Sequence, residues 1–98
     1  MSQEEHRSVE KFKAVCKVCG ETFEKKNKAY GDAIWKTGVL GAIVELIGAT
    51  ARLPQMVLRN KQHGRDIKES LIDVLLDIHN YAAIGIMMVD ADNWEGEE

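Results

Sequence analysis

The sequence predicts an all-α protein: three long antiparallel helices that assemble into an oligomeric, dimeric helical bundle. Apolar residues recur at spacings of three and four along three separate stretches, which is the period of a helix with one buried face. No stretch alternates apolar and polar residues as a strand does, and no hairpin turn is visible. The chain has 98 residues, of which 45% are hydrophobic and one is Pro. This composition indicates a single globular domain over residues 1–98.

The first helix is predicted over residues 4–26. Gly20 lies inside it and weakens the helix without breaking it. Residues 29–37 are predicted to form a linker to the next helix. The apolar face of this first helix carries residues three or four apart, which are Val9, Phe12, Cys16, Cys19 and Phe23.

The second helix is predicted over residues 38–60, with Thr37 as its N-cap. Pro54 lies inside this range and predicts a kink or a helix that restarts. The helix is apolar nearly all round, which is typical of a buried helix. Because three helices cannot bury a central helix well, we expect a homodimeric bundle.

The third helix is predicted over residues 67–89. Gly64 marks the turn before it, and Asp66 with Glu69 matches a capping box at its start. The tail, about residues 90–98, is acidic, and we expect it to fray, with docking through Trp94 as the alternative.

Charge and hydropathy exclude several function classes. The net charge is -3, so a generally basic nucleic-acid binder is not expected. Residues 69–98 contain eight of the 16 acidic residues and none of the 13 Lys and Arg, so these acids face water, meet a basic surface or bind a cation. The longest apolar run, residues 38–51, is shorter than the roughly 20 residues that span a bilayer. The N-terminus is polar and unlike a signal peptide. We therefore expect a cytoplasmic protein with no membrane partner.

Cys16 and Cys19 resemble the first half of a zinc finger, but that reading fails. A finger needs two His about a dozen residues later, and the next His is His63. Two small apolar residues on the core face of the first helix explain the pair better. A four-cysteine zinc site shared by two chains is the remaining alternative.

The second helix carries an unusual stripe that contains the acid Glu45 inside an apolar run. Its small residues indicate that another helix or a ligand packs closely there. A buried carboxylate is costly unless it is compensated, so we expect a metal ion, Arg52 of a partner chain or a hydrogen-bond network beside Glu45. The stripe consists of Gly38, Gly41, Glu45, Gly48 and Arg52.

The third helix places four polar residues on one face, with no Lys or Arg among them. An amphipathic helix with a solvated acidic face is one explanation. The other is a site for a hard cation, because carboxylates from two helices suit Mg²⁺ or Mn²⁺. In that second explanation Glu45, Asp73 and Asp77 are the metal ligands. The four residues of this face are Glu69, Asp73, Asp77 and Asn80.

Several segments resemble a known family, the phage and prokaryotic nucleotide-modification-associated helical domain, which belongs with the MazG-like all-α NTP pyrophosphohydrolases. The resemblance spans about residues 27–86. It rests on Tyr30-Gly31-Asp32-Ala33, on Gly38 with the apolar run to Arg52-Leu53, on Glu69-Ser70, on Asp73-Val74-Leu75-Leu76-Asp77 and on Asn80-Tyr81-Ala82.

The resemblance implies an all-α fold that assembles as a homodimer or homotetramer. It also implies Mg²⁺-dependent cleavage of a nucleoside triphosphate to a monophosphate and pyrophosphate. MazG-like enzymes carry E-x-x-E on one helix and E-x-x-D on the next. Glu45 matches the first acid and Asp73 the aspartate. Gly48 and Ser70 stand where the other two acids are expected, so both motifs are incomplete.

The resemblance and the spacing together assign roles to individual residues. Glu69 is the candidate general base and Asn80 a candidate substrate contact. Arg52 and Lys36 are candidates for phosphate contact, and Tyr30 (or Trp35) for stacking on the base. The alternative function is a non-catalytic helical oligomer that binds a nucleotide or serves as an interaction scaffold.

Overall fold

The computed structural model describes the backbone of residues 3–63 and 67–98 and the side chains of residues 6–59 and 67–98. It confirms the all-α class, since no strand occurs in the described ranges. The elements in order are α1 (Gln3–Tyr30), the short 3₁₀ helix η1 (Ala33–Lys36), α2 (Gly38–His63) and α3 (Lys68–Asp90). The chain divides into two compact units, Met1–Asp32 and Ala33–Glu98.

The first unit is essentially the single helix α1, which passes through Gly20 without a break. It extends beyond the predicted end at residue 26 and stops at Gly31, whose φ of 57° is left-handed. The Gly31 N–H donates to the Asn27 carbonyl at 2.7 Å, and the Asn27 amide donates to the Asp32 carboxylate at 2.8 Å. Glycine after the last helical residue is a common helix stop, so Tyr30-Gly31 carried the signal that sets the boundary.

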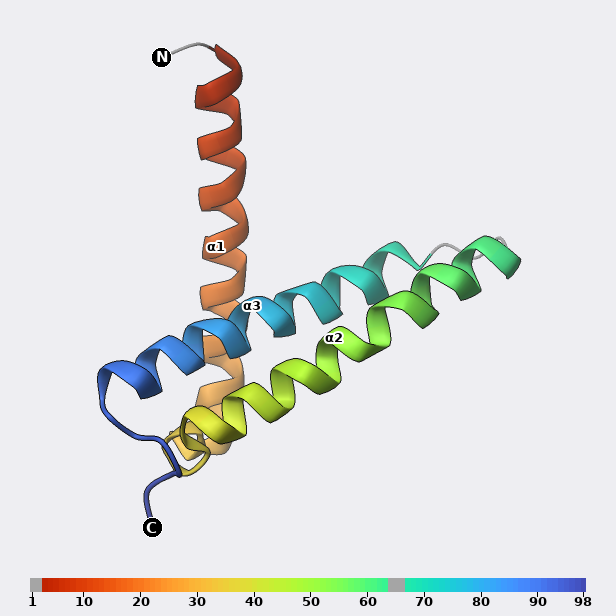
Figure 1. Cartoon of the computed structure of the whole chain (residues 1–98). Coiled ribbons are helices and arrows are strands. Elements are labelled where there is room, and N and C mark those ends of the chain that lie inside the picture. Colours follow the sequence, from red (N-terminus) through yellow and green to blue (C-terminus); the bar gives the residue numbers. More distant parts are fainter. Residues whose placement is uncertain (1–2, 64–66) are drawn as a thin grey trace. The chain divides into compact units, whose positions relative to one another are not determined.

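The second unit is a hairpin in which α2 and α3 lie side by side and antiparallel (Figure 1). Small residues let the two helices approach closely. A Cβ built on Gly85 would lie 4.0 Å from the Cβ of Ala42. We call the line of contact between the helices the seam. Its buried residues are Val39, Ala42 and Ala49 on α2 and Val74, Ile84 and Met88 on α3.

The expectation that α2 is buried all round is wrong for the single chain. One antiparallel neighbour covers only one face of a helix, and α3 is that neighbour. The opposite side of α2 keeps large apolar side chains exposed, for example Leu40 at 56% and Ile47 at 62%. The helix continues through Pro54 as one element, so it does not restart there.

Thr37 occupies the predicted N-cap position, since α2 begins at Gly38 and the Thr37 carbonyl accepts from Gly41 N–H at 3.0 Å. Its side chain points to the preceding turn, because the Thr37 hydroxyl donates to the Ile34 carbonyl at 2.6 Å. The first N–H groups of α2 are satisfied instead by the C-terminal tail. Val39 N–H donates to the Asn93 carbonyl at 2.9 Å, and Leu40 N–H donates to the Trp94 carbonyl at 3.1 Å. The backbone carbonyls of Asn93 and Trp94 therefore take the place of a capping side chain at the start of α2.

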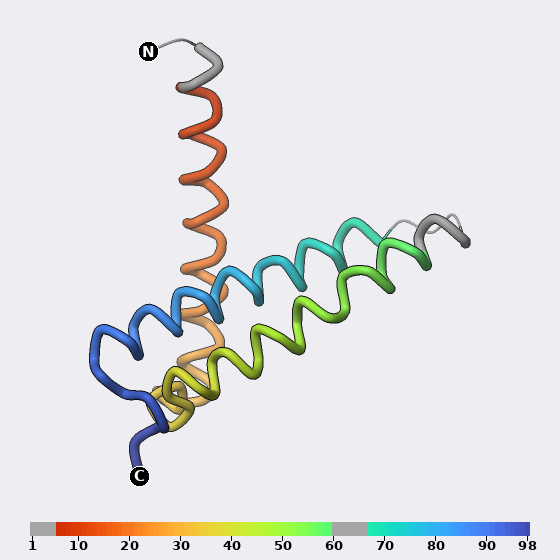
Figure 2. Tube along the Cα trace, viewed as in Figure 1, coloured from red at the N-terminus to blue at the C-terminus, as the bar shows by residue number. Residues whose placement is uncertain are grey.

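The tail that we expected to fray is docked, and it returns to the start of α2 (Figure 2). Asn93 fixes it: its side-chain amide donates to the Trp35 carbonyl at 2.8 Å, and its side-chain oxygen accepts from Gly96 N–H at 2.9 Å. Glu97 N–H donates to the same Trp35 carbonyl at 3.0 Å. Trp94 is 52% exposed, so Asn93 anchors the tail rather than Trp94.

The helix α3 begins at Lys68, with Ile67 in the N-cap position and no side-chain hydrogen bond capping it. The other partners of the predicted turn and capping box, Gly64 and Asp66, lie outside the described residues. By length and composition alone α3 is apolar enough to cross a membrane, although core helices of soluble proteins satisfy the same criterion.

Candidate functional site

Glu45, the acid expected to be buried, is exposed on α2. The small residues around it do not mark a close helix contact. A Cβ on Gly48 would meet nothing within 4 Å, and the atoms nearest to one on Gly41 belong to the side chain of Thr37, on the same segment of chain. The space at Gly38 is filled by the tail backbone at Gly96. Within a single chain, Glu45 therefore needs no compensating partner, because water solvates it.

The four polar residues of α3 divide into two environments. Glu69 and Asp73 are exposed, whereas Asp77 and Asn80 are half-buried. The Asn80 side-chain oxygen lies 3.1 Å from Nδ1 of His79. Because Asp77 is three residues after Val74, it lies close to the line of the seam, and Asp73 lies farther toward solvent.

An open hollow of about 380 Å³ lies between α2 and α3, and both Arg52 and Asp73 line it. It contains a second cation, Arg59, and a second polar side chain, Gln55, that sequence analysis did not select. Arg52, Gln55 and Arg59 follow a helical spacing of three and four, and that signal could have identified them. The full lining is Arg52, Gln55, Met56, Arg59, Ser70, Asp73 and Val74.

The hollow combines two guanidinium groups with one carboxylate. Guanidinium groups bind phosphate oxygens through paired N–H donors. A carboxylate beside them is a ligand for Mg²⁺. We call this lining the arginine hollow. Its chemistry suits an anionic ligand that carries a divalent cation.

The three proposed metal ligands do not form a closed metal site within one chain. Among the described residues no group of three or more His, Cys, Asp or Glu side chains is placed to hold a metal ion. Asp73 and Asp77 are one helical turn apart, and Asp73 alone lines the arginine hollow. Any Mg²⁺ here would take its remaining ligands from water and from a bound phosphate.

Two predicted substrate contacts, Lys36 and Tyr30, do not line the arginine hollow. Lys36 ends η1 and is exposed. Tyr30 ends α1, belongs to the other unit and is 73% exposed. Nothing in the described geometry brings either residue to Asp73.

Cys19 is fully buried and Cys16 is half-buried. Burial of Cys19 agrees with the prediction that the two cysteines are small apolar residues on the core face of the first helix. Burial, with a smaller contribution from Cys16, raises the pKa of the Cys19 thiol above its ordinary value. A thiol with a raised pKa is a poor nucleophile at neutral pH. Cys19 is therefore a structural residue on α1.

We expect iodoacetamide to modify Cys19 more slowly in the folded chain than in urea at pH 8.5. The thiolate is the reacting form, and a raised pKa lowers its fraction at that pH. Mass spectrometry of tryptic peptides after timed quenching would measure both rates. Equal rates in the folded and unfolded chain would contradict the burial of Cys19.

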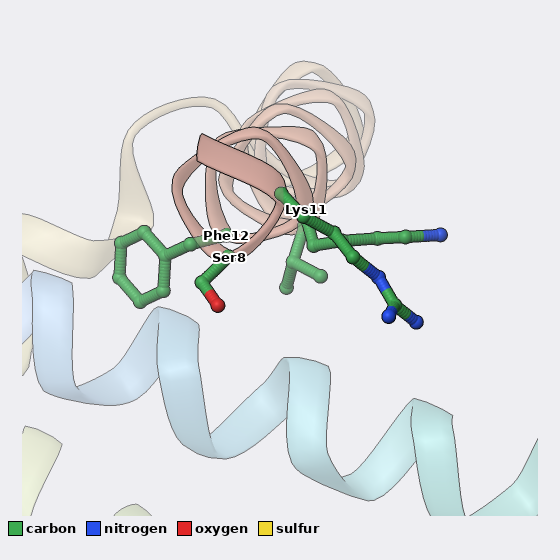
Figure 3. Close-up of a pocket in the computed structure, with 5 residues that line it drawn as sticks. Ser8, Lys11 and Phe12 are labelled. Atoms are coloured by element: carbon green, nitrogen blue, oxygen red, sulfur yellow. The ribbon is translucent and has the colours of Figure 1, made fainter. Parts of the chain in front are cut away.

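The helix α1 carries a second hollow, which sequence analysis did not predict (Figure 3). Two cations, a hydroxyl and two apolar side chains line it, and all five are exposed. Exposed side chains on one helix surface hold no ligand in a fixed geometry, so we assign it no function. The residues are Arg7, Ser8, Lys11, Phe12 and Val15.

No protein-family model, curated protein or solved structure matches this chain. The similarity to MazG-like proteins therefore rests on the sequence motifs alone.

Proposed function

We propose that this chain binds the phosphates of a nucleoside triphosphate in the arginine hollow and cleaves it, with Mg²⁺ or Mn²⁺, to a monophosphate and pyrophosphate. The observation that carries the proposal is that Arg52 and Arg59 line one hollow together with Asp73. Two cations and a carboxylate at one place match a ligand made of phosphate and a divalent cation.

Each residue has a defined task in this proposal. Arg52 and Arg59 hold the phosphate chain and neutralise its charge. Asp73, the carboxylate in the lining of the hollow, would hold the metal ion, with phosphate oxygens and water as its other ligands. Asp77 and Glu45, the other two ligands expected from the sequence, do not line the hollow. When bound, the ion would polarise the phosphates and lower the pKa of a water molecule.

The reaction is hydrolysis at the α-phosphorus. Water forms the new P–O bond, the bond between the α-phosphorus and its bridging oxygen breaks, and pyrophosphate leaves. Glu69 is exposed one turn before Asp73 and takes the proton of the water. Asn80, Lys36 and Tyr30 remain proposed contacts for the nucleotide, and a cytoplasmic location would give access to that substrate.

The test is release of pyrophosphate from a panel of NTPs and dNTPs with Mg²⁺ or Mn²⁺. We expect turnover by the wild-type chain and at least a 100-fold lower rate for Asp73→Ala, since loss of a metal ligand removes transition-state stabilisation. The control is Glu95→Ala, which removes one exposed acid from the tail. Equal rates for wild type and Asp73→Ala would refute the enzyme proposal.

A second candidate is a helical oligomer that binds the nucleotide without cleaving it. It is favoured by the lack, among the residues described, of any three-carboxylate group able to hold a metal, and by Gly48 and Ser70 at two acidic positions of the motifs. Calorimetry with a non-hydrolysable dNTP separates the candidates. Binding that does not depend on Mg²⁺, together with no pyrophosphate release, would favour this second function.

A further inference from the structure

The α2–α3 hairpin has a second set of apolar residues that the seam does not use. On each helix these residues recur at spacings of three and four, so they form a continuous stripe. We call the two stripes together the apolar face. Its residues are Leu40, Ile43, Ile47, Ala51, Pro54 and Leu58 on α2 and Ile72, Leu75, His79, Ala82, Ile86 and Val89 on α3.

The two stripes lie on the same side of the hairpin. A groove of about 530 Å³ between the helices is lined by Ile43 from α2 and by Ala82, Ile86 and Val89 from α3. The side chains are open to solvent, with Ile86 exposed by 72%. An apolar area of this extent on a soluble chain marks an interaction surface.

We propose that the apolar face binds the same face of a second copy of this chain, so that two hairpins form a four-helix bundle about a two-fold axis. The charge of the face permits self-association. No Lys, Arg, Asp or Glu occupies any of its twelve positions, and His79 is the one ionisable residue among them. The charged residue in the lining of the groove is Asp90, which is exposed at the last position of α3. Two copies can therefore meet along the twelve positions without burying like charges, with Asp90 at the edge of the interface.

The size of the apolar face also suits a dimer. At about 1.5 Å per residue, helices of this length extend over roughly 35 Å, and two helices side by side are roughly 20 Å wide. The face therefore covers on the order of 700 Å². A stable dimer buries about 800 Å² on each partner, so one hairpin supplies close to the required area.

The width of the apolar face and the spacing of its two stripes favour a second hairpin, and not a single helix, as the binding partner. One helix is about 10 Å wide and would cover the groove but leave the outer edges of both stripes exposed. A second hairpin brings two stripes with the same spacing, which lets side chains interdigitate as in four-helix bundles. Each α2 would then be covered on two faces, as its apolar composition requires.

A membrane is the competing occupant, because α3 is long and apolar enough to span one. The side of α3 away from the apolar face carries Asp73, Asp77 and Asn80. In a bilayer these groups would lie at the depth of the lipid tails, where an ionisable side chain raises the free energy of insertion. In a dimer of hairpins Asp73 keeps its access to water and to the arginine hollow.

The experiment measures the mass of the full chain in detergent-free buffer by sedimentation equilibrium. We expect twice the chain mass of 11.0 kDa at micromolar concentration. Ile86→Glu and Ile47→Glu, one on each stripe, should lower the measured mass to that of one chain by burying a charge in the interface. Circular dichroism at equal concentration verifies that each variant is still helical.

Met87→Glu is the matched control, because Met87 is the next residue on α3, is also exposed and lies outside the apolar face. It should sediment as the wild type does. A wild-type chain with the mass of one copy would overturn the proposal, and so would a dimer that survives both stripe substitutions. Recovery of the chain only with detergent micelles or lipid vesicles would assign the face to a membrane and also overturn it. The result does not depend on nucleotide cleavage, so either proposal can fail alone.

Discussion

Gly96→Ala is expected to lower the free energy of unfolding by about 2–4 kcal/mol. The backbone at Gly96 has a φ of 100°, which side-chain-bearing residues rarely adopt. A Cβ at this position would also overlap the carbonyl oxygen of Lys36 and lie 2.8 Å from its carbonyl carbon. Backbone atoms cannot move aside as a flexible side chain does. The substitution should therefore release the tail from Trp35 and from the start of α2.

Thermal unfolding followed by circular dichroism would measure this loss at one fixed protein concentration. Each kcal/mol corresponds to roughly 4–8 °C in Tm for a domain of this size. Gly48→Ala is the control, because Gly48 lies within α2 with open space around its Cβ position. Alanine there should raise stability by up to about 1 kcal/mol through its helix propensity. A loss of the same size at both glycines would contradict the docked tail.

The double substitution Arg52→Ala/Arg59→Ala is expected to weaken binding of a non-hydrolysable dNTP by about 10- to 100-fold. Each guanidinium would donate charge-assisted hydrogen bonds to phosphate, worth about 1.5–3 kcal/mol apiece before screening by solvent. Isothermal titration calorimetry at low ionic strength measures the change in Kd. Because the arginine hollow is open to solvent, we expect the effect to shrink as salt is added.

The control for this experiment is Lys13→Ala/Lys25→Ala, which removes two exposed positive charges from α1. The net charge of both double variants is the same, so nonspecific attraction of the nucleotide falls equally. Binding should stay close to wild type in the lysine variant. Equal weakening in both variants would show that overall charge, and not the arginine hollow, attracts the nucleotide.

The helices were predictable because their signals are local. Apolar spacing located all three within a few residues, and Gly31 explains where α1 ends. The docked tail was not predictable. The side-chain amide of Asn93 joins the tail to Trp35, 58 residues earlier in the chain, and no local sequence pattern indicates which distant backbone a tail will contact.

The candidate site shows the same division. The helix faces that carry Arg52 and Asp73 could be identified in the sequence, since residues three and four apart share a helix face. Which stripe of α2 faces which stripe of α3 depends on the rotation of each helix about its own axis. That rotation is set by small seam residues such as Ala42 and Ala49, and it brought Arg59 into the hollow while leaving Glu45 exposed.

By itself the sequence determined the helical class, the approximate helix boundaries and the separation of acids from apolar residues, because these depend on neighbours within one or two turns. Only the tertiary structure decided that α3 covers a single face of α2, that Glu45 meets water and that the tail caps α2. These outcomes depend on close packing between segments far apart in the chain, where a difference of one methyl group decides which surfaces can touch.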